Sequence, residues 1–424
     1  MNLLARFYYV WRRFAKMISI FAVIAGPGII VMVADNDAGG ITTYTVTGAL
    51  FLFSFIWIEV LLGPVAYICQ EMTVRLGAIT KRGHAEAIFD AFGPFWGWFS
   101  LLDLTMTDFL TIVTEFIGMT AAMSIFGVSP IITVIAVICL IMGMVISGRY
   151  WTWEKIVLAF CGLNLIFIPA SFLFNVSWHS VASGFIPGFP YGLNGNVIFF
   201  VMANIGTTIA PWMIFFQQSS VVDKDLQEKD INYSRVDTAI GSFFTIIVAV
   251  FCIIIFATLL PHTNVQSAAQ GAQQILKFSA PVKYVGVLVA VGLFDAGLLG
   301  AICISLASAW AWGEVFGWPH SLNHPFKAAP GFYVFRFLIL AGAAAIVLIP
   351  GAPLILITLF VQVIAVTLLP AALTFLLLLL NQEEVVGKWK NSRAQNILAV
   401  IIITVIIAMS TIYAMTTIFP NLFG

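Results

Sequence analysis

The feature that most constrains the fold is a series of apolar runs, each long enough to cross a lipid bilayer. A transmembrane helix needs about 20 mostly apolar residues. The runs are continuous, without the alternation of barrel strands. We therefore predict an all-α integral membrane protein, one membrane domain over 1–424, with eleven transmembrane helices. They lie at roughly 17–47, 49–72, 95–124, 130–148, 156–176, 195–222, 236–260, 283–312, 332–350, 354–380 and 396–419.

Composition excludes several other classes of protein. Hydrophobic residues make up 61% of the chain and charged residues 9%, against about 25% charged in an average soluble domain. A soluble enzyme or a disordered chain is excluded on this ground, and the balance of 19 Lys and Arg against 19 Asp and Glu argues against a nucleic-acid partner. The five cysteines are far apart, so we expect no disulfide framework, no resident metal and no cofactor.

Basic residues predict the orientation, because cytoplasmic loops carry an excess of Lys and Arg. The loop 177–194 contains neither. We therefore expect a cytoplasmic N-terminus, an extracellular C-terminus and a location in the plasma (inner) membrane of a bacterium. The basic residues on the predicted cytoplasmic side are Arg6, Arg12, Arg13, Lys16, Arg75, Lys81, Arg82, Arg149, Lys155, Lys224, Lys229, Arg235, Lys327, Lys388, Lys390 and Arg393.

Two of the apolar runs are interrupted near the middle of the membrane. The first contains Asp35-Asn36-Asp37-Ala38-Gly39-Gly40, and the sixth contains 204–212 with Gly206 and Pro211. Carboxylates and helix breakers at this depth are costly unless they line a cavity or bind something. Since the breaks are five runs apart, they indicate an inverted repeat, with helices 1–5 in 17–176 and helices 6–10 in 195–380, followed by an eleventh helix at 396–419.

These residues resemble the Nramp family of divalent-metal transporters. The segment 26–40 resembles the family's first helix, with Asp37 on its signature Asp, and 206–212 resembles its sixth-helix signature. The segments 70–86, 111–118 and 361–370 resemble helices 2, 3 and 10. The resemblance implies a LeuT-type five-plus-five inverted repeat with broken helices 1 and 6, and a chain that moves divalent metal ions and is not an enzyme.

The candidate residues fall into three groups, placed by the resemblance together with the polar residues of the runs. Asp108 and Glu115 are seven residues apart and so share a helix face, and Asp295 lies in the repeat-related eighth run. The candidate metal-site residues are Asp37, Thr207, Gly40, Ala210, Gln362 and Asp35; the candidate ion-path residues are Asp108, Glu115 and Asp295; the candidate helix breaks are Gly39, Gly206 and Pro211.

Departures from the family pattern bear on the cargo. Ala210 stands where the family has its Met, and Thr207 adds a hydroxyl. Loss of a thioether favours a hard cation, and Mg²⁺ is usually held by one or two carboxylates with several waters retained. Ile112 and Trp212 replace a family Asp and His that serve proton transfer. The pattern therefore resembles the Nramp-related magnesium transporters, and it implies uncoupled uptake of partly hydrated Mg²⁺, with Mn²⁺ as a second cargo.

Other readings remain open. The main alternative is a proton-coupled Mn²⁺/Fe²⁺ symporter of conventional Nramp type. A carrier of an amino acid or another organic solute would have to overcome repulsion of its carboxylate by the acids of the first break. An intramembrane aspartyl enzyme that uses Asp35 and Asp37 fits poorly. The catalytic acids of such enzymes lie on separate helices, whereas Asp35 and Asp37 lie on one short segment. We expect the lipid membrane and the metal ion as partners, and a functional monomer.

Overall fold

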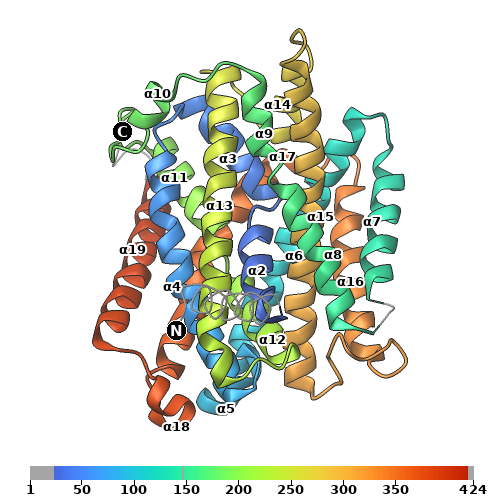
Figure 1. Ribbon diagram of the computed structural model, residues 1–424, viewed down its shortest axis with the longest axis vertical. Coiled ribbons are helices and arrows are strands. Elements are labelled where there is room, and N and C mark those ends of the chain that lie inside the picture. The colour runs from blue at the N-terminus through green and yellow to red at the C-terminus, as the bar shows by residue number, and fades with distance from the viewer. Residues whose placement is uncertain (1–22, 146–147, 419–424) are drawn as a thin grey trace, which may run out of the picture.

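The computed structural model describes residues 23–145 and 148–418, and within them every regular element is helical (Figure 1). Eight helices in these ranges are long and apolar enough to cross a membrane. The all-helical membrane fold is thereby confirmed. The predicted start of the first run at 17–22, the basic residues of 1–16 and the predicted end of the last run at 419 lie outside the described residues.

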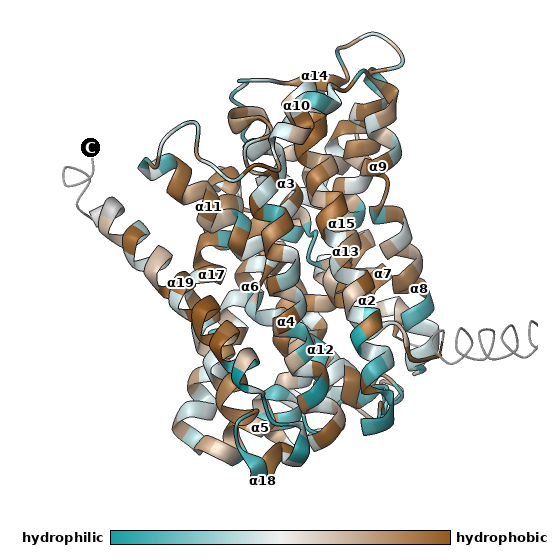
Figure 2. Ribbon diagram, turned by 60° about the vertical axis from the view of Figure 1, so that its left-hand side comes forward, coloured by the Kyte–Doolittle hydropathy of each residue, from teal (hydrophilic) through white to brown (hydrophobic). Residues whose placement is uncertain are grey.

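Most of the long helices run side by side along the long axis of the molecule. Short helices mark the two ends: α10 (Trp178–Ser183) and α14 (Ala268–Ile275) at the top of Figure 1, α5 (His84–Phe92) and α18 (Glu383–Val386) at the bottom. In Figure 2, apolar residues dominate the middle of the bundle and hydrophilic residues gather near α5, α12 and α18. The long helices are α4 (Ile56–Thr80), α6 (Pro94–Ile125), α7 (Pro130–Met144), α8 (Tyr150–Asn164), α13 (Ile231–Leu259), α15 (Lys283–Phe316), α16 (Pro330–Val347), α17 (Leu354–Leu379) and α19 (Arg393–Ile418), and the four-residue α9 (Phe167–Ala170) follows α8.

The first interrupted run forms two helices, α2 (Pro27–Ala34) and α3 (Ala38–Phe51), stacked end to end. The break lies at Asp35–Asp37, whereas we expected it at Gly39, which is in the first turn of α3. The reason is capping. Asp37 is extended, with ψ of 179°, and its side chain accepts a hydrogen bond from the N–H of Gly40, so that α3 begins directly after it.

The second interrupted run forms α11 (Gly195–Thr208) and α12 (Pro211–Asp223). Pro211 is the first residue of α12, where its missing N–H needs no acceptor. Gly206 lies inside α11 and not in the break. A Cβ at Gly206 would lie 2.0 Å from the carbonyl oxygen of Gln362, so this glycine serves the close approach of α11 to α17.

Packing places both breaks in the middle of the bundle. Helix α6 packs along α15, and α13 packs against α2, α3 and α4. Helix α17 contacts α11, α6 and α3. The two broken helices are thus enclosed by α4, α6, α13, α15 and α17, and polar groups at the breaks face protein and not lipid.

Candidate functional site

Asp37 caps the helix that follows the first break. It is buried at the N-terminus of α3, and its Oδ1 accepts the hydrogen bond from the backbone N–H of Gly40 at 2.6 Å. The unpaired N–H groups and the positive dipole end of a helix N-terminus stabilise a carboxylate. The break therefore holds a fixed acidic group in the interior of the bundle.

A second carboxyl group reaches Asp37 from α6. Glu115 is fully buried, and its Oε2 accepts a 2.9 Å hydrogen bond from the N–H of Ala38, the residue that follows Asp37. A Cβ at Gly300 of α15 would lie 2.7 Å from Glu115 Oε2 and 3.0 Å from the Cβ of Asp37. Gly300 thus permits α15 to approach this pair of acids.

Two polar side chains of the other segments converge on the same helix end. Thr207 Oγ1 is buried without a hydrogen-bond partner, and a Cβ at Gly40 would lie 2.5 Å from it. Gln362 Nε2 is also buried without a partner, and a Cβ at Gly39 would lie 1.8 Å from it. Rotation of the Gln362 side-chain amide by half a turn exchanges its nitrogen and oxygen, so that either atom can face this position. Asp37, Thr207 and Gln362 therefore meet at the N-terminus of α3, with two polar atoms free to contact a ligand.

Ala210 lies at the other break, as the residue that precedes α12. Its N–H points at a thioether, because Met213 Sδ lies 3.4 Å from it. The sequence analysis missed Met213, since the family comparison placed the Met position at Ala210. Helical spacing could have indicated Met213, because it follows Ala210 by three residues and residues three apart on a helix are neighbours. A soft sulfur donor is therefore located beside the break.

Asp35 and Glu59 are two further buried acids near the breaks. Asp35 Oδ2 and Glu59 Oε1 are buried without partners, and Thr208 Oγ1 donates to Glu59 Oε2 at 3.2 Å. Glu59 did not enter the predicted site, because nothing in the chain signals a contact between residues 149 positions apart.

The three predicted ion-path acids are not all in one place. Asp108 of α6 accepts a 2.6 Å hydrogen bond from Ser308 of α15, so it lies on the same α6–α15 interface as Glu115. Asp295 lies against α8, where Asn164 Nδ2 approaches its Oδ2 at 3.4 Å. Asp108 and Glu115 share a face as expected, whereas Asp295 contacts a different neighbour.

The chemistry of the site is that of an oxygen-rich cation position. Within the described ranges, no group of three or more His, Cys, Asp or Glu side chains is arranged to hold a metal ion. A cation at Asp37 would therefore rely on one or two carboxylates, a hydroxyl, an amide, backbone carbonyls and retained water.

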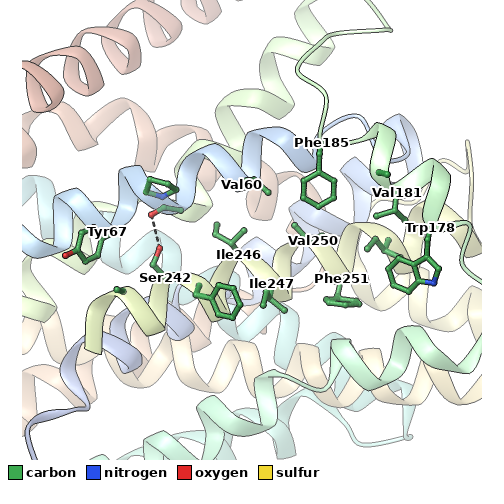
Figure 3. A pocket seen from close by; sticks show the side chains of 16 residues that line it. Val60, Tyr67, Trp178, Val181, Phe185, Ser242, Ile246, Ile247, Val250 and Phe251 are labelled. Carbon is green, nitrogen blue, oxygen red and sulfur yellow. Dashed lines mark hydrogen bonds between the residues drawn. The ribbon is translucent and has the colours of Figure 1, made fainter. Parts of the chain in front are cut away.

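A large cavity lies elsewhere and has a different character. It has a volume of about 810 Å³ and lies between α4 and α13 below α10 (Figure 3). Its lining is apolar apart from Tyr67 and Ser242, and the hydroxyl of Ser242 donates to the carbonyl of Gly63 at 2.8 Å. None of the predicted site residues lines it. The cavity suits hydrocarbon and not an ion.

Fold and site together define a multi-pass membrane protein with two discontinuous helices around a buried acidic position. The same fold occurs in solved structures. A variant of the Eremococcus coleocola manganese transporter matches with a TM-score of 0.79 at 20% identity, over 94% of this chain and 88% of that chain. MhsT in complex with L-phenylalanine matches with a TM-score of 0.57 at 13% identity, over 92% and 98%. The architecture is therefore LeuT-like.

Sequence comparison identifies the family. Residues 28–416 match the model of the family Nramp, described as natural resistance-associated macrophage protein-like, and the chain belongs to this family. The natural resistance-associated macrophage protein 2 homolog of Dictyostelium discoideum is 23% identical over 91% of this chain and 61% of its own length. The divalent metal cation transporter MntH of Brucella suis is 24% identical over 70% of this chain and 66% of its own length. The matches thus span a little under two thirds of these relatives.

Proposed function

We propose that this chain transports divalent metal cations across the membrane by alternating access. The observation that carries the proposal is the convergence of Asp37, Thr207 Oγ1 and the Gln362 amide at a broken helix, with the last two lacking any partner. Discontinuous helices at the midplane are where transporters of this architecture bind ions. Similar proteins are named as a divalent metal cation transporter and a manganese transporter, which supports metal-cation transport by this chain. The family is one of transporters and not of enzymes.

The names of the relatives, a divalent metal cation transporter and a manganese transporter, favour the conventional cargo. The first candidate is therefore the conventional one, proton-coupled uptake of Mn²⁺ or Fe²⁺. Met213 supports this reading, because thioether sulfur favours transition metals over Mg²⁺. Its Sδ lies at the break, although not at the sequence position of the family's Met.

A second candidate is uncoupled uptake of partly hydrated Mg²⁺. The observation that favours it is the donor set at Asp37, which consists of oxygen and amide groups without His or Cys. Moving a charge of +2 inward through 100 mV releases about 4.6 kcal/mol, so the membrane potential alone suffices to drive uptake. Ile112 and Trp212 support the absence of proton coupling, since neither titrates.

Flux into proteoliposomes tests the function and separates the two candidates. Purified chain is reconstituted, and Mg²⁺, Mn²⁺ and internal pH are followed with dyes in wild type, Asp37→Ala and a control, Asp90→Asn, on the short helix α5. Metal uptake that Asp37→Ala reduces to the level of empty liposomes, with the control unaffected, supports transport. Uptake of neither metal in wild type would overturn it.

The identity of the cargo follows from the same traces. Mg²⁺ uptake without acidification supports the uncoupled candidate, and Mn²⁺ uptake with stoichiometric acidification supports the conventional one. Met213→Leu sharpens the comparison. If the thioether is a ligand, this variant lowers Mn²⁺ uptake more than Mg²⁺ uptake; an unchanged ratio would exclude Met213 from the site.

Topology and assembly complete the proposal. The apolar runs and the basic residues support eleven transmembrane helices, ten of them in two repeats, with a cytoplasmic N-terminus and a plasma-membrane location. The buried site is built from one chain, which supports a functional monomer. Accessibility of single cysteines introduced into 177–194, measured with impermeant reagents on whole cells, tests the orientation; labelling from the cytoplasmic side alone would overturn it.

A further inference from the structure

Glu59 is a buried carboxylate whose surroundings leave it without a counter-charge. It lies in the first turn of α4, and its Oε2 accepts the 3.2 Å hydrogen bond from Thr208, the last residue of α11. Its Oε1 is buried and has no partner. No ion pair among the described residues includes Glu59. One hydrogen bond therefore compensates a carboxyl group that is fully removed from solvent.

Asp35 lies at the first break, next to the end of α11. A Cβ at Gly40 would lie 3.3 Å from the backbone oxygen of Asp35 and 2.5 Å from Oγ1 of Thr207, the residue before Thr208. The side chain of Asp35 is buried, and its Oδ2 has no partner. The hydroxyl of Tyr44 completes the group, because it lies 3.4 Å from Thr208 Oγ1. The carboxylates of Asp35 and Glu59 and the hydroxyls of Thr208 and Tyr44 form a patch of oxygen atoms, which we name the outer oxygen group.

An uncompensated carboxylate inside a membrane protein is expensive, and such acids usually mark ion pathways. Acids that have structural roles elsewhere in this chain have backbone N–H donors or a basic side chain as partners. Asp237 accepts hydrogen bonds from the N–H groups of Gly26 and Gly28 at 3.0 and 2.7 Å, and Glu154 pairs with Lys224 at 2.6 Å. The outer oxygen group has no comparable structural partner in the described chain, which points to a ligand.

We propose that the outer oxygen group is a second binding position for the divalent cation, distinct from the position at Asp37. The inference rests on the proposed function. Two carboxylates with neutral oxygen donors and retained water suit a divalent cation, and especially a hard one. Asp35, which the sequence analysis assigned to the main site, then belongs to the second position and joins the two.

The second position lies between the main site and the end of the molecule that carries α10. Trp57, two residues before Glu59, donates from its backbone N–H to Gly184 at 3.0 Å and from Nε1 to Gly188 at 3.2 Å, in the segment that follows α10. This segment belongs to the loop predicted to be extracellular. A cation entering from outside therefore reaches Glu59 before Asp37. The second position raises the local concentration of cations next to the main site. Its loss is therefore expected to raise the KM for the cation more than it lowers the maximal transport rate.

Binding stoichiometry tests the inference on the full-length chain. Titration calorimetry with Mn²⁺ alone and with Mg²⁺ alone is carried out on wild type, Glu59→Gln and Asp103→Asn, a control acid of α6 outside both positions. We expect two cations per chain in wild type and in the control, and one in Glu59→Gln. Thr208→Val, which removes the hydroxyl and keeps the carboxylate, is expected to weaken the second event without abolishing it.

Flux provides the second readout. Glu59→Gln is expected to raise the KM for the cation by about tenfold at a nearly unchanged maximal rate, because the main site is intact. Equal stoichiometry in wild type and Glu59→Gln, with equal KM, would overturn the inference. So would a Glu59→Gln variant that changes only proton uptake, because the group would then hold a proton and not a metal ion.

The outcomes separate this inference from the proposed function. If wild type transports a cation, Asp37→Ala abolishes transport and wild type binds one cation, only the second position is disproved. If wild type neither binds nor transports a divalent cation, the proposed function itself fails. A thermal unfolding midpoint of Glu59→Gln within a few degrees of wild type establishes that the variant is folded.

Discussion

The carboxylate of Glu115 accepts a 2.9 Å hydrogen bond from the backbone N–H of Ala38, so a side chain of α6 holds the first residue of α3. This contact fixes the end of the broken helix that presents Asp37. It also ties the position of the acidic site to the packing of α6 on α15, because Gly300 is in contact with the same carboxylate.

Substitution of Glu115 is expected to distinguish its structural role from its charge. In Glu115→Ala the buried N–H of Ala38 loses its acceptor, which costs about 1–3 kcal/mol of the free energy of unfolding. Glu115→Gln keeps an acceptor oxygen and is expected to recover most of that stability while removing the charge. Thermal unfolding in detergent and metal flux are measured on both variants. Equal stability of the Ala and Gln variants would contradict the capping role.

Two glycines near the site are expected to respond differently to alanine. At Gly206 the new Cβ would lie 2.0 Å from the backbone oxygen of Gln362. Because backbone atoms can move away only if a helix shifts, Gly206→Ala is expected to destabilise the fold strongly. At Gly39 the Cβ would meet the end of the Gln362 side chain, which can rotate away. Gly39→Ala is therefore expected to fold and to lose transport through displacement of the amide.

Expression level, unfolding midpoint and flux measured side by side check this contrast. Gly143→Ala in α7, where a Cβ would meet nothing within 4 Å, is the matched control and is expected to leave all three unchanged. A Gly39→Ala variant that transports like wild type would show that the Gln362 side chain is not needed at the site.

The sequence predicted some of these relationships and could not predict others, for physical reasons. Apolar runs and helix breakers are local signals, and they were sufficient for the all-helical membrane fold and for Asp37 at a break. The contact of Glu59 with Thr208 joins helices that are distant in the chain, and no local pattern carries it. Helical spacing correctly put Asp108 and Glu115 on one face, but spacing does not reveal the neighbouring helix, and Asp295 lies against α8. Met213 was missed because a residue-by-residue family comparison does not follow a side chain that reaches back over one turn.

The end of α2 opposite the break is held by Asp237 of α13. Its two carboxylate oxygens accept from the N–H groups of Gly26, the residue before α2, and of Gly28, in the first turn of that helix. Asp237→Ala leaves these donors unpaired and is expected to loosen α2, with a loss of about 1–3 kcal/mol. Hydrogen exchange of residues 26–34 is then expected to be faster. Asp225→Asn is the control and is expected to show no change, because Asp225 is an exposed acid that interacts with Lys81 and Gln227 and not with α2. Exchange in Asp237→Ala as slow as in wild type would show that other contacts hold α2.

His84 gives the fold a pH dependence that can be measured. Burial lowers the pKa of His84 to about 4, while its Nδ1 lies 2.9 Å from Gln218 Oε1. In the unfolded chain the imidazole takes up its proton near pH 6.5. Between these two pH values the imidazole is protonated in the unfolded chain and neutral in the folded chain. The free energy of unfolding therefore falls as the pH falls, by about 3 kcal/mol in total. Above pH 7 the imidazole is neutral in both states and no penalty applies.

Unfolding midpoints measured between pH 7 and pH 4.5 check this expectation by comparison of slopes, because other groups also titrate in this range. Gln at position 84 can keep a hydrogen bond to Gln218 and has no proton to gain. His84→Gln is therefore expected to lose less stability on acidification than wild type. His179→Gln, on the short helix α10 and with an exposed side chain, is expected to follow wild type. If His84→Gln and wild type lose stability in parallel, His84 takes up its proton in the folded state without cost; the contact with Gln218 is compatible with that outcome, because the Nδ1–H that faces Gln218 Oε1 is present in both protonation states.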